Sequence, residues 1–588
     1  MCPADIIVEL GTDIPVTNAT ATGGCTTPSI SFMDNITGPT RALLLHEKKS
    51  KHSWATRSPV NVTVDEPITA TGNGTSFVAQ ILGPLVPFTA NMTVTNSTQQ
   101  ARAMRDFRSP APMPNVAQTH SAQILESGQG FSPPDPTLDA SSNWVVTMTN
   151  WGGGSRLVIY SAADLTLQGS FILNTEAVSG DCATNGAGDP QLLYDEVADR
   201  WVVLEFTAGL NDLCIYATDS NNPLTANWML YQIMTPTFPD YPKFGVFGDL
   251  YTVTTNENDM SGATPAIYFI ERQPIVTGAM TTRWFRVTRP PLDGFGFQAY
   301  APVTVEGGPQ PGAGIHENGA LFMRHNDDES HSFTPVGGQD FVEVAHYKNV
   351  NFDMSTASLT TYSIPVPEFD SDLCGLGGTS CVVHPGDTPL DPLREVIMDR
   401  LVYRSIPGKS QQSIVATWAT NVGADRPGIF WAEFRPSGMG SMWSLFQSNI
   451  YSPSGDVARW MPSAAMDSQG TVCMIYSVAS AMKEPSLRVT TRLANDAAGM
   501  LRNELEVAAG GAPAVDGSSR WGDYFGMATD PSQPRIFFAI GEFSPPGSGV
   551  WQVHVSRLRI SGDVIERTFT AEDTCMDSDS CIQTITVQ

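Results

Sequence analysis

The chain has 588 residues, of which 41% are hydrophobic and 16% are charged, and it contains 51 Gly and 43 Pro. This composition supplies enough apolar residues for a core and many turn-forming residues between short segments, which is typical of an all-β protein. A formal net charge of −27 repels nucleic acid, and the sequence has no apolar run long enough to span a membrane. We therefore exclude nucleic-acid binding and a membrane span, and interpret the acidic charge as a solubility feature.

Residues 1–110 are predicted to form a small β-rich domain or stalk, because alternating stretches such as 60–64 and 92–95 are typical of strands. All six Asn of the first hundred residues begin an Asn-x-Thr sequon, and none does from residue 101 on. The six are Asn18, Asn35, Asn61, Asn73, Asn91 and Asn96. This pattern predicts a glycosylated surface made in a eukaryotic secretory pathway. The first ten residues have neither the basic nor the apolar region of a secretory signal.

Alternate prolines at 110, 112 and 114 block helix and central strand, and predict a linker over 111–120. Over 121–560 a unit of about 40 to 70 residues recurs as strand, Asp-containing turn, strand. Examples are 190–206, 242–254, 462–476 and 525–540. Counting units that begin near 121, 188, 240, 298, 399, 459 and 520 predicts a seven-bladed β-propeller of four-stranded blades. Two stacked β-sandwiches are the alternative.

Eight of the nine cysteines fall into pairs that are close in sequence. The predicted disulfides are Cys2 with Cys25, Cys182 with Cys214, Cys374 with Cys381, and Cys575 with Cys581. The last pair would close a C-terminal tail over 561–588. Cys473 lies in an apolar run and is expected to be a buried free thiol. Such short closed loops favour an oxidising compartment, so we expect an extracellular or cell-surface protein.

Several phrases in the second part resemble a family of uncharacterised secreted bacterial β-propeller proteins, some of them described as sialidase-like or BNR-repeat proteins. The phrases that carry this resemblance are 188–201, 238–245, 399–404, 459–467 and 519–527. They occur in family order over about residues 120–560, and the resemblance implies a propeller fold without implying a mechanism. Residues 1–110 lie outside it. The sialidase Asp-box is only half present at 466–470, which has no following Trp.

The loops that enter the innermost strands of a propeller converge near its axis, so the recurring phrases predict one shared site. Its members are Asp189, Asp240, Tyr241, Arg400, Arg404, Arg459, Arg520, Asp523 and Tyr524. In one hypothesis Arg400, Arg404, Arg459 and Arg520 bind the carboxylate or sulfate of a sugar, and Asp240, Tyr241, Asp523 and Tyr524 are catalytic, as in sialidases that use a Tyr nucleophile.

In the alternative hypothesis the same residues hold blades together, through Arg-Trp stacking and Asp caps on turns. Repetition in several blades favours this structural role, since a catalytic group is normally needed once. No dedicated metal centre is predicted. His316, Glu317, His325 and His331 form a His-rich patch that could bind a metal on a loop, or could be a solvated insertion. Within it, the carboxylates of Asp327, Asp328 and Glu329 would suit Ca²⁺ better than Zn²⁺.

Three functions are consistent with these patterns. The first is an extracellular glycoprotein whose propeller serves recognition or assembly, with glycans or other extracellular proteins as partners. The second is a glycoside hydrolase or lyase that acts on anionic polysaccharide at the propeller face. The third is a subunit of a polymeric surface structure that assembles with itself. The sequence leaves open whether the protein is an enzyme.

Overall fold

The computed structural model describes residues 132–561 almost continuously, and outside this range it describes eight strands. Within 132–561 it does not describe 178, 210, 260–261, 293–298, 308–318, 331–337, 349–351, 353–357, 376–379, 387, 394–395, 407–410, 437–441, 454, 512–518 and 547–550. The chain divides into two compact units. One comprises Met1–Ala117, Thr491–Asn503 and Ile560–Gln588, and the other comprises Gln118–Thr490 and Glu504–Arg559.

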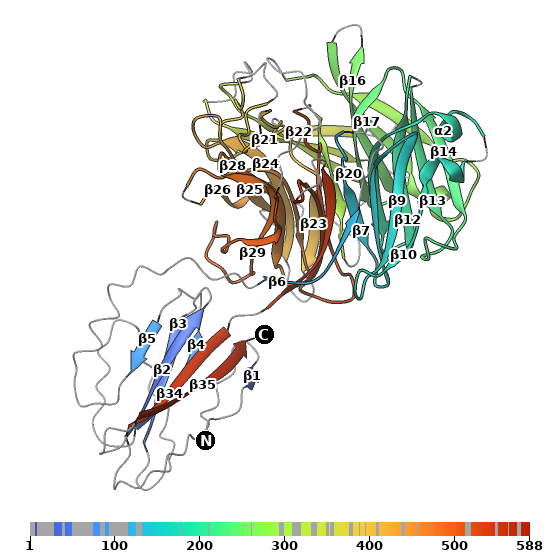
Figure 1. Cartoon of the computed structure of the whole chain (residues 1–588). Helices are drawn as coiled ribbons and strands as arrows, with labels where there is room; N and C mark the ends of the chain where they lie inside the picture. Colours follow the sequence, from blue (N-terminus) through green and yellow to red (C-terminus); the bar gives the residue numbers. More distant parts are fainter. Residues whose placement is uncertain are drawn as a thin grey trace. The chain divides into compact units, whose positions relative to one another are not determined.

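The first unit contains a sheet built from both ends of the chain (Figure 1). Its strand order is β1-β35-β34-β2-β5, and β3 and β4 form a separate pair. The bounds are β1 Ile6–Val8, β2 Ser29–Thr37, β3 Ala42–Lys49, β4 Thr75–Leu82, β5 Thr89–Met92, β34 Val564–Glu572 and β35 Ser578–Val587. Strand β2 pairs antiparallel with β34 along its whole length. The segment that the sequence suggests is a C-terminal tail thus supplies two strands of this sheet.

The second unit confirms the predicted seven-bladed propeller (Figure 1). Five four-stranded sheets and one eight-stranded sheet, which contains two blades, make up the ring. Blade 1 comprises β7 Thr137–Ala140, β8 Trp144–Trp151, β9 Gly154–Ser161 and β10 Leu167–Ile172. Blade 2 comprises β11 Gly186–Asp195, β12 Arg200–Thr207, β13 Asp212–Thr218 and β14 Trp228–Met234. Blade 3 comprises β15 Pro239–Phe247, β16 Leu250–Asp259, β17 Gly262–Glu271 and β18 Trp284–Thr288.

Blades 4 to 7 follow in chain order, and the last strand of blade 7 comes from before blade 1. Blade 4 comprises β19 Ala301–Val305, β20 Gly319–Asn326, β21 Phe341–Lys348 and β22 Ser358–Pro365, and blade 5 comprises β23 Leu401–Ile406, β24 Gln411–Asn421, β25 Pro427–Pro436 and β26 Trp443–Tyr451. Blade 6 comprises β27 Ala458–Met466, β28 Val472–Ser480, β29 Lys483–Arg492 and β30 Leu505–Ala508. Blade 7 comprises β31 Gly526–Thr529, β32 Ile536–Phe543, β33 Gln552–Ile560 and β6 Val116–Ile124. The short helices are η1 Leu173–Glu176, α2 Asp181–Thr184 and α3 Arg272–Val276.

Strand β6 closes the ring by lying against β33 at the edge of blade 7. Gln118 of β6 donates from Nε2 to Ser556 Oγ at 2.9 Å, and Thr119 Oγ1 donates to the carbonyl oxygen of Arg557 at 3.2 Å. Residues 116–120, which the sequence analysis places in a linker, are therefore part of a blade. The first blade begins only at Thr137.

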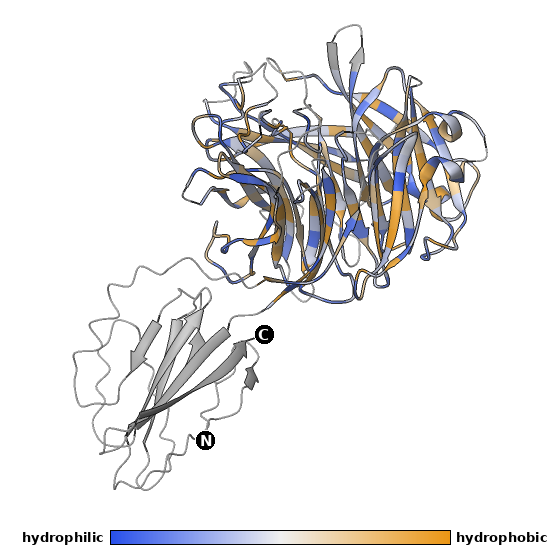
Figure 2. Ribbon diagram, viewed as in Figure 1, coloured by the Kyte–Doolittle hydropathy of each residue, from blue (hydrophilic) through white to orange (hydrophobic). Residues whose placement is uncertain are grey.

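Burial explains why these sequences form strands. Every residue of β13 and of β28 is buried, whereas most of β22 is exposed or half-buried. Strands in the middle of a blade are covered on both faces by neighbouring blades and so consist of continuous apolar runs, while the outermost strand keeps a solvent face. Figure 2 shows the hydrophobic colouring that such strands carry. The core clusters lie between successive blades, as in the one that joins blades 2 and 3.

Blades 4 and 5 are joined more closely than the others. Their innermost strands β19 and β23 pair in parallel, with Val303 opposite Leu401 and Val305 opposite Tyr403. This backbone ladder makes one eight-stranded sheet of the two blades. Among the described helices of the chain, none has the length and apolar character needed to cross a membrane.

Candidate functional site

Four blades begin with the same backbone feature. Asp135, Asp189, Tyr241 and Met461 have φ values of 45°, 47°, 51° and 52°, and each precedes a proline. At the last three the register of the sheet shifts, which marks a β-bulge at the start of the innermost strand. Non-glycine residues seldom adopt this conformation, and bulges redirect the side chains of a strand. Three of these residues, Asp135, Asp189 and Tyr241, belong to one cluster of side chains from separate blades.

Lys243 lies at the centre of this meeting point. Its Nζ is 3.8 Å from the ring centroid of Tyr241 and 3.4 Å from that of Tyr524, so the ammonium group contacts two aromatic faces. The residue is 2% exposed. Within the described residues Nζ has no hydrogen-bond acceptor. Blade 3 thus contributes a buried cation that is held by rings from blades 3 and 7.

The two tyrosines use their hydroxyl groups in the fold. The hydroxyl of Tyr241 donates to the carbonyl oxygen of Asp523 at 3.1 Å, and that of Tyr524 donates to the carbonyl oxygen of Pro190 at 2.8 Å. Both tyrosines are at most 1% exposed. Burial, with nearby carboxylates adding to it, raises the pKa of each phenol well above its ordinary value. These phenols therefore stay protonated.

The carboxylate of Asp135 links blades 1 and 7, and Asn150 extends this link to blade 2. Oδ1 accepts the backbone N–H of Asp523 at 2.7 Å, and Oδ2 accepts Nδ2 of Asn150 at 2.7 Å. The amide oxygen of Asn150 accepts the backbone N–H of Asp189 at 2.8 Å. Gly188 makes this approach possible, because a Cβ there would lie 2.2 Å from the Asn150 amide oxygen and its φ is +98°.

Burial shifts the pKa values of several ionisable side chains in this cluster. Burial raises the pKa of Asp135 to about 7, with the charge of Asp523 adding to the effect. Burial also raises the pKa of Asp240 and of Asp399. For Lys243, burial lowers the pKa to about 8, although the surrounding carboxylates act in the opposite direction. The cluster can therefore exchange protons near neutral pH.

Arg400 and Arg404 form a second network beside the first. Arg400 pairs with Asp139 at 2.9 Å and with Glu306 at 2.8 Å, so it connects blades 1, 4 and 5. Arg404 lies 3.5 Å from the other oxygen of Glu306 and donates to Thr529 Oγ1 of blade 7 at 2.7 Å. Both arginines are buried. The structure places these two predicted substrate-binding residues in ion pairs with the protein's own carboxylates.

The other two predicted arginines differ in exposure. Arg459 is 2% exposed and forms a forked pair with Glu504, at 2.6 Å and 3.1 Å. Arg520 pairs with Asp523, and 45% of its side chain is exposed. The structure does not place Arg459 among the residues that contact Lys243, whereas Arg520 reaches that cluster through Asp523. The binding roles of all four arginines remain predictions.

Among the residues of these networks that sequence reasoning missed are Lys243, Asp135 and Asp399 of the first, and Asp139 and Glu306 of the second. A signal was present for Lys243, because it is a single lysine inside a strand most of whose residues are buried. Asp135 precedes Pro136, and so shares the Asp-Pro pattern of Asp189. Nothing in the sequence shows that these positions meet, because they come from different blades.

Two of the predicted disulfides are present, Cys182–Cys214 and Cys374–Cys381. The free thiol of Cys473 is buried, as expected. Cys2, Cys25 and Cys575 lie outside the described residues, and the side chain of Cys581 in β35 is not described.

Of the six sequons, Asn35 lies in β2 and Asn91 in β5. Asn18, Asn61, Asn73 and Asn96 lie outside the described residues, as do His316, Glu317 and His331.

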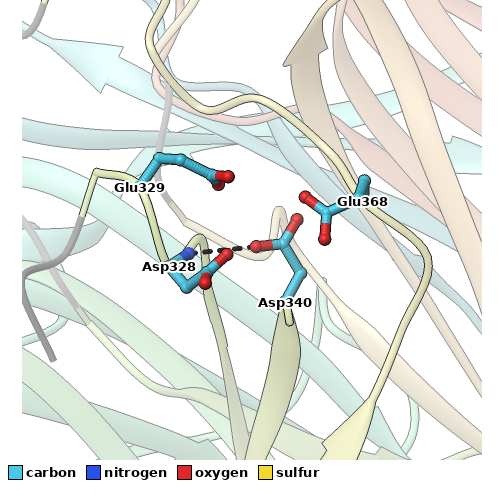
Figure 3. Close-up of side chains that lie close together, drawn as sticks. All are labelled: Asp328, Glu329, Asp340 and Glu368. Carbon is cyan, nitrogen blue, oxygen red and sulfur yellow. Dashed lines mark hydrogen bonds between the residues drawn. The ribbon is translucent and has the colours of Figure 1, made fainter. Parts of the chain in front are cut away.

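Four carboxyl groups converge in blade 4, around the turn that follows β20 (Figure 3). They belong to Asp328, Glu329, Asp340 and Glu368, and one oxygen of each lies within 4.8 Å of the others. Figure 3 shows these carboxylates facing one another, with the N–H of Asp328 donating to Asp340 at 3.0 Å. Burial raises the pKa of Asp340 to about 7. Oxygen donors in this arrangement are ligands that Ca²⁺ accepts.

Asp327 behaves differently from its neighbours in this acidic cluster. Its Oδ2 accepts both the N–H and the hydroxyl of Ser371, at 2.6 Å and 2.7 Å, and its Oδ1 accepts the backbone N–H groups of Glu329 and Ser330. Its carboxylate is thus used to hold two loops together. Binding of Ca²⁺ by Asp328 and Glu329 remains a prediction.

No family model matches the chain, and no curated protein matches it. The resemblance to sialidase-like or BNR-repeat proteins therefore stays a prediction. Among solved structures, the chain is similar to an ulvan lyase of a polysaccharide lyase family, with 10% identity, coverage of 75% of this chain and 97% of the other, and a TM-score of 0.40.

Two further similar structures are propellers of other kinds. The WD40 domain of coronin from Toxoplasma gondii has 8% identity, coverage of 76% of this chain and 88% of the other, and a TM-score of 0.36. The β-propeller domain of the Trilobed protease from Pyrococcus furiosus has 6% identity, coverage of 79% and 96%, and a TM-score of 0.34. Similarities at this level carry no argument about function.

Proposed function

We propose that the protein is an extracellular recognition module whose propeller binds glycans, and that it does not hydrolyse them through Tyr241 or Tyr524. The observation that carries this proposal is the use of both phenols as buried donors to backbone carbonyl oxygens. A Tyr nucleophile must be reachable by its substrate and must lose its proton, and burial opposes both.

The state of the arginines supports binding of uncharged rather than anionic glycans. An enzyme for anionic polysaccharide needs guanidinium groups that can pair with the substrate. In this chain Arg400 and Arg459 are buried against protein carboxylates, and the net charge of −27 repels a polyanion. Secretion is supported by the six sequons and by two disulfides, since disulfides persist in oxidising compartments.

A glycan array combined with turnover assays on the same ligands tests this proposal. We expect binding to at least one class of glycan without release of reducing ends or unsaturated products. The variants Tyr241→Phe and Tyr524→Phe should bind like the wild type, provided that each remains folded at the assay temperature. Turnover that disappears in Asp523→Asn or Tyr524→Phe would overturn the proposal in favour of the glycoside hydrolase or lyase.

A further inference from the structure

Strand β6 closes the ring with few buried side chains. It is the outermost strand of blade 7 and comes from before blade 1, so its pairing with β33 joins the beginning of the propeller to its end. Among residues 116–123, Val116 alone is buried. Elements with few buried contacts open at a lower free energy than the core. The closure therefore depends on the backbone ladder and on a small number of side-chain contacts.

The imidazole ring of His554 on β33 makes one of these contacts. Its Nε2 lies 2.9 Å from the amide nitrogen of Gln118 on β6, and the same nitrogen donates to Ser556 Oγ at 2.9 Å. An amide nitrogen only donates, so Nε2 of His554 is the acceptor, and the neutral ring carries its hydrogen on Nδ1. The residue is 5% exposed, and its ring meets the ring of Phe543 edge to face.

Protonation of His554 would abolish this contact. Both nitrogens of an imidazolium ion are donors, so the charged ring and the amide nitrogen of Gln118 would face each other as two donors. Rotation of the Gln118 amide would offer its oxygen as an acceptor, but the positive charge would still be buried. Departure of β6 from β33 gives the charged ring access to water.

The described side chains around His554 do not neutralise a positive charge on it. Burial alone lowers the pKa of His554 from 6.5 to about 4, without a contribution from a neighbouring charge. The ionisable side chains of the adjoining strand segments contact other groups: Arg557 of β33 donates to the carbonyl oxygen of Ala162, His120 of β6 contacts Thr119 Oγ1, and Glu542 of β32 accepts the N–H of Gly522.

Blade 6 packs against the same region through β29. A Cβ on Gly541, which lies opposite His554 in β32, would be 2.8 Å from the side chain of Leu487. The charged residues Lys483 and Arg488 of β29 pair with Glu506. The contact that blade 6 makes beside His554 is therefore apolar.

We propose that protonation of His554 weakens the attachment of β6 and opens the ring at its closure in acid. Because the pKa of the buried ring is lower than that of an exposed one, the closure is fully stable above pH 6.5 and loses stability as the pH falls towards 4. At pH 5 these pKa values shift the opening equilibrium of β6 by about thirtyfold. This property of the fold is independent of glycan recognition.

Hydrogen exchange of the full chain, measured by mass spectrometry at pH 7.5 and pH 5, tests this proposal. Correction for the intrinsic exchange rate at each pH gives protection factors that report the opening of β6. Strand β10 is the internal reference, because it is also an outermost strand, has no buried residue and has no ionisable side chain. We expect β6 to lose protection about thirtyfold at pH 5, and β10 to change by less than about threefold.

Two variants assign the effect to a residue. His554→Gln removes the titrating group, and we expect the pH dependence of β6 to disappear in it. His346→Gln is the matched control, since His346 lies on β21 of blade 4 and burial, with the charge of Lys348 adding to it, also lowers its pKa to about 4. We expect β6 to respond to pH in this variant as in the wild type. His554→Asn serves the same purpose if His554→Gln fails to fold.

Three results would overturn the proposal. Protection of β6 that stays unchanged at pH 5 in the wild type would do so without any variant. An equal loss in β6 and β10 would mean that acid opens the outer strands of the ring in general. A loss in β6 that persists in His554→Gln would assign the effect to another group.

Discussion

Replacement of Glu205 by glutamine should make the protein more stable at alkaline pH, although it removes a charge. Glu205 lies on β12 between blades 1 and 2 and is fully buried. Two glycines leave room for its carboxyl group, because a Cβ at Gly186 or Gly154 would lie 2.8 Å or 3.0 Å from one of its oxygens. Burial raises its pKa from 4.5 to about 8, while Ser155 acts in the opposite direction.

The magnitude follows from the difference in proton affinity between the folded and unfolded states. The pKa is raised in the folded state, so the stabilisation is complete below pH 4.5 and is lost as the pH rises towards 8. Each pH unit in this window costs about 1.4 kcal/mol, so the loss reaches about 4 kcal/mol near pH 8. The side-chain amide of the Glu205→Gln variant cannot ionise, and the variant therefore avoids this loss.

The assay is guanidinium-induced unfolding of the wild type and of Glu205→Gln at pH 5 and pH 8. The difference between the two proteins cancels other titrating groups, such as Asp135. We expect similar stability at pH 5 and a variant that is more stable by about 4 kcal/mol at pH 8. A difference that changes by less than about 1 kcal/mol between these pH values would refute the reasoning, because Glu205 would then be ionised at little cost in the native state.

Glu504→Gln is a control variant, for which we expect the opposite dependence of stability on pH. Burial acts to raise the pKa of Glu504, but the hydrogen bonds and charges of Arg459 and Arg488 outweigh it and leave the pKa lowered. A lowered pKa contributes stability above the unfolded value, and this stability is lost as the pH falls. Glu504→Gln should therefore destabilise the protein more at pH 8 than at acidic pH.

Three further predictions concern the backbone, a disulfide and calcium. Gly307 and Gly209 have φ values of +63° and +69°, but a Cβ at Gly307 would lie 1.3 Å from an arginine nitrogen whereas one at Gly209 meets nothing. Gly307→Ala should therefore lower the thermal midpoint clearly more than Gly209→Ala, which should cost about 1 kcal/mol, and equal effects would contradict the packing argument. The Cys182–Cys214 disulfide spans 32 residues, and its removal by paired Ala substitutions should lower the free energy of unfolding by about 4 kcal/mol. An unchanged midpoint in denaturant unfolding would contradict this prediction. If the acidic cluster of blade 4 takes up Ca²⁺ as the sequence suggests, added Ca²⁺ should raise the thermal midpoint and a chelator should reverse the rise; an unchanged midpoint at millimolar Ca²⁺ would dismiss this expectation.

Local patterns were sufficient for the propeller and its blade count. Every blade has buried strands, and in blades 2, 3, 6 and 7 the turn between the first two strands contains Asp. These features depend on residues that are neighbours in sequence. Asp467 illustrates this, because its Oδ1 accepts the N–H groups of Gln469 and Thr471 within its own turn. The pairing of Cys182 with Cys214 was predictable for the same reason, since the two residues lie close together in the chain.

Contacts between blades were not predictable in this way. Arg400 was chosen as a substrate ligand because an arginine near the axis suits an anion, yet it pairs with Asp139, which is 261 residues away in sequence. The choice between a ligand and a protein carboxylate depends on which side chains share the axis. That is decided by the closure of the ring.

The sequence by itself determined that this is an acidic, all-β, seven-bladed protein with local disulfides, because strand periodicity and turn chemistry act over a few residues. Only the tertiary structure decided what the axial residues do. It placed Lys243 between Tyr241 and Tyr524, and placed β2 beside β34, so that distant parts of the chain meet. The physical reason is that burial and charge pairing are properties of the assembled ring, in which a side chain acquires its neighbours only when the blades close.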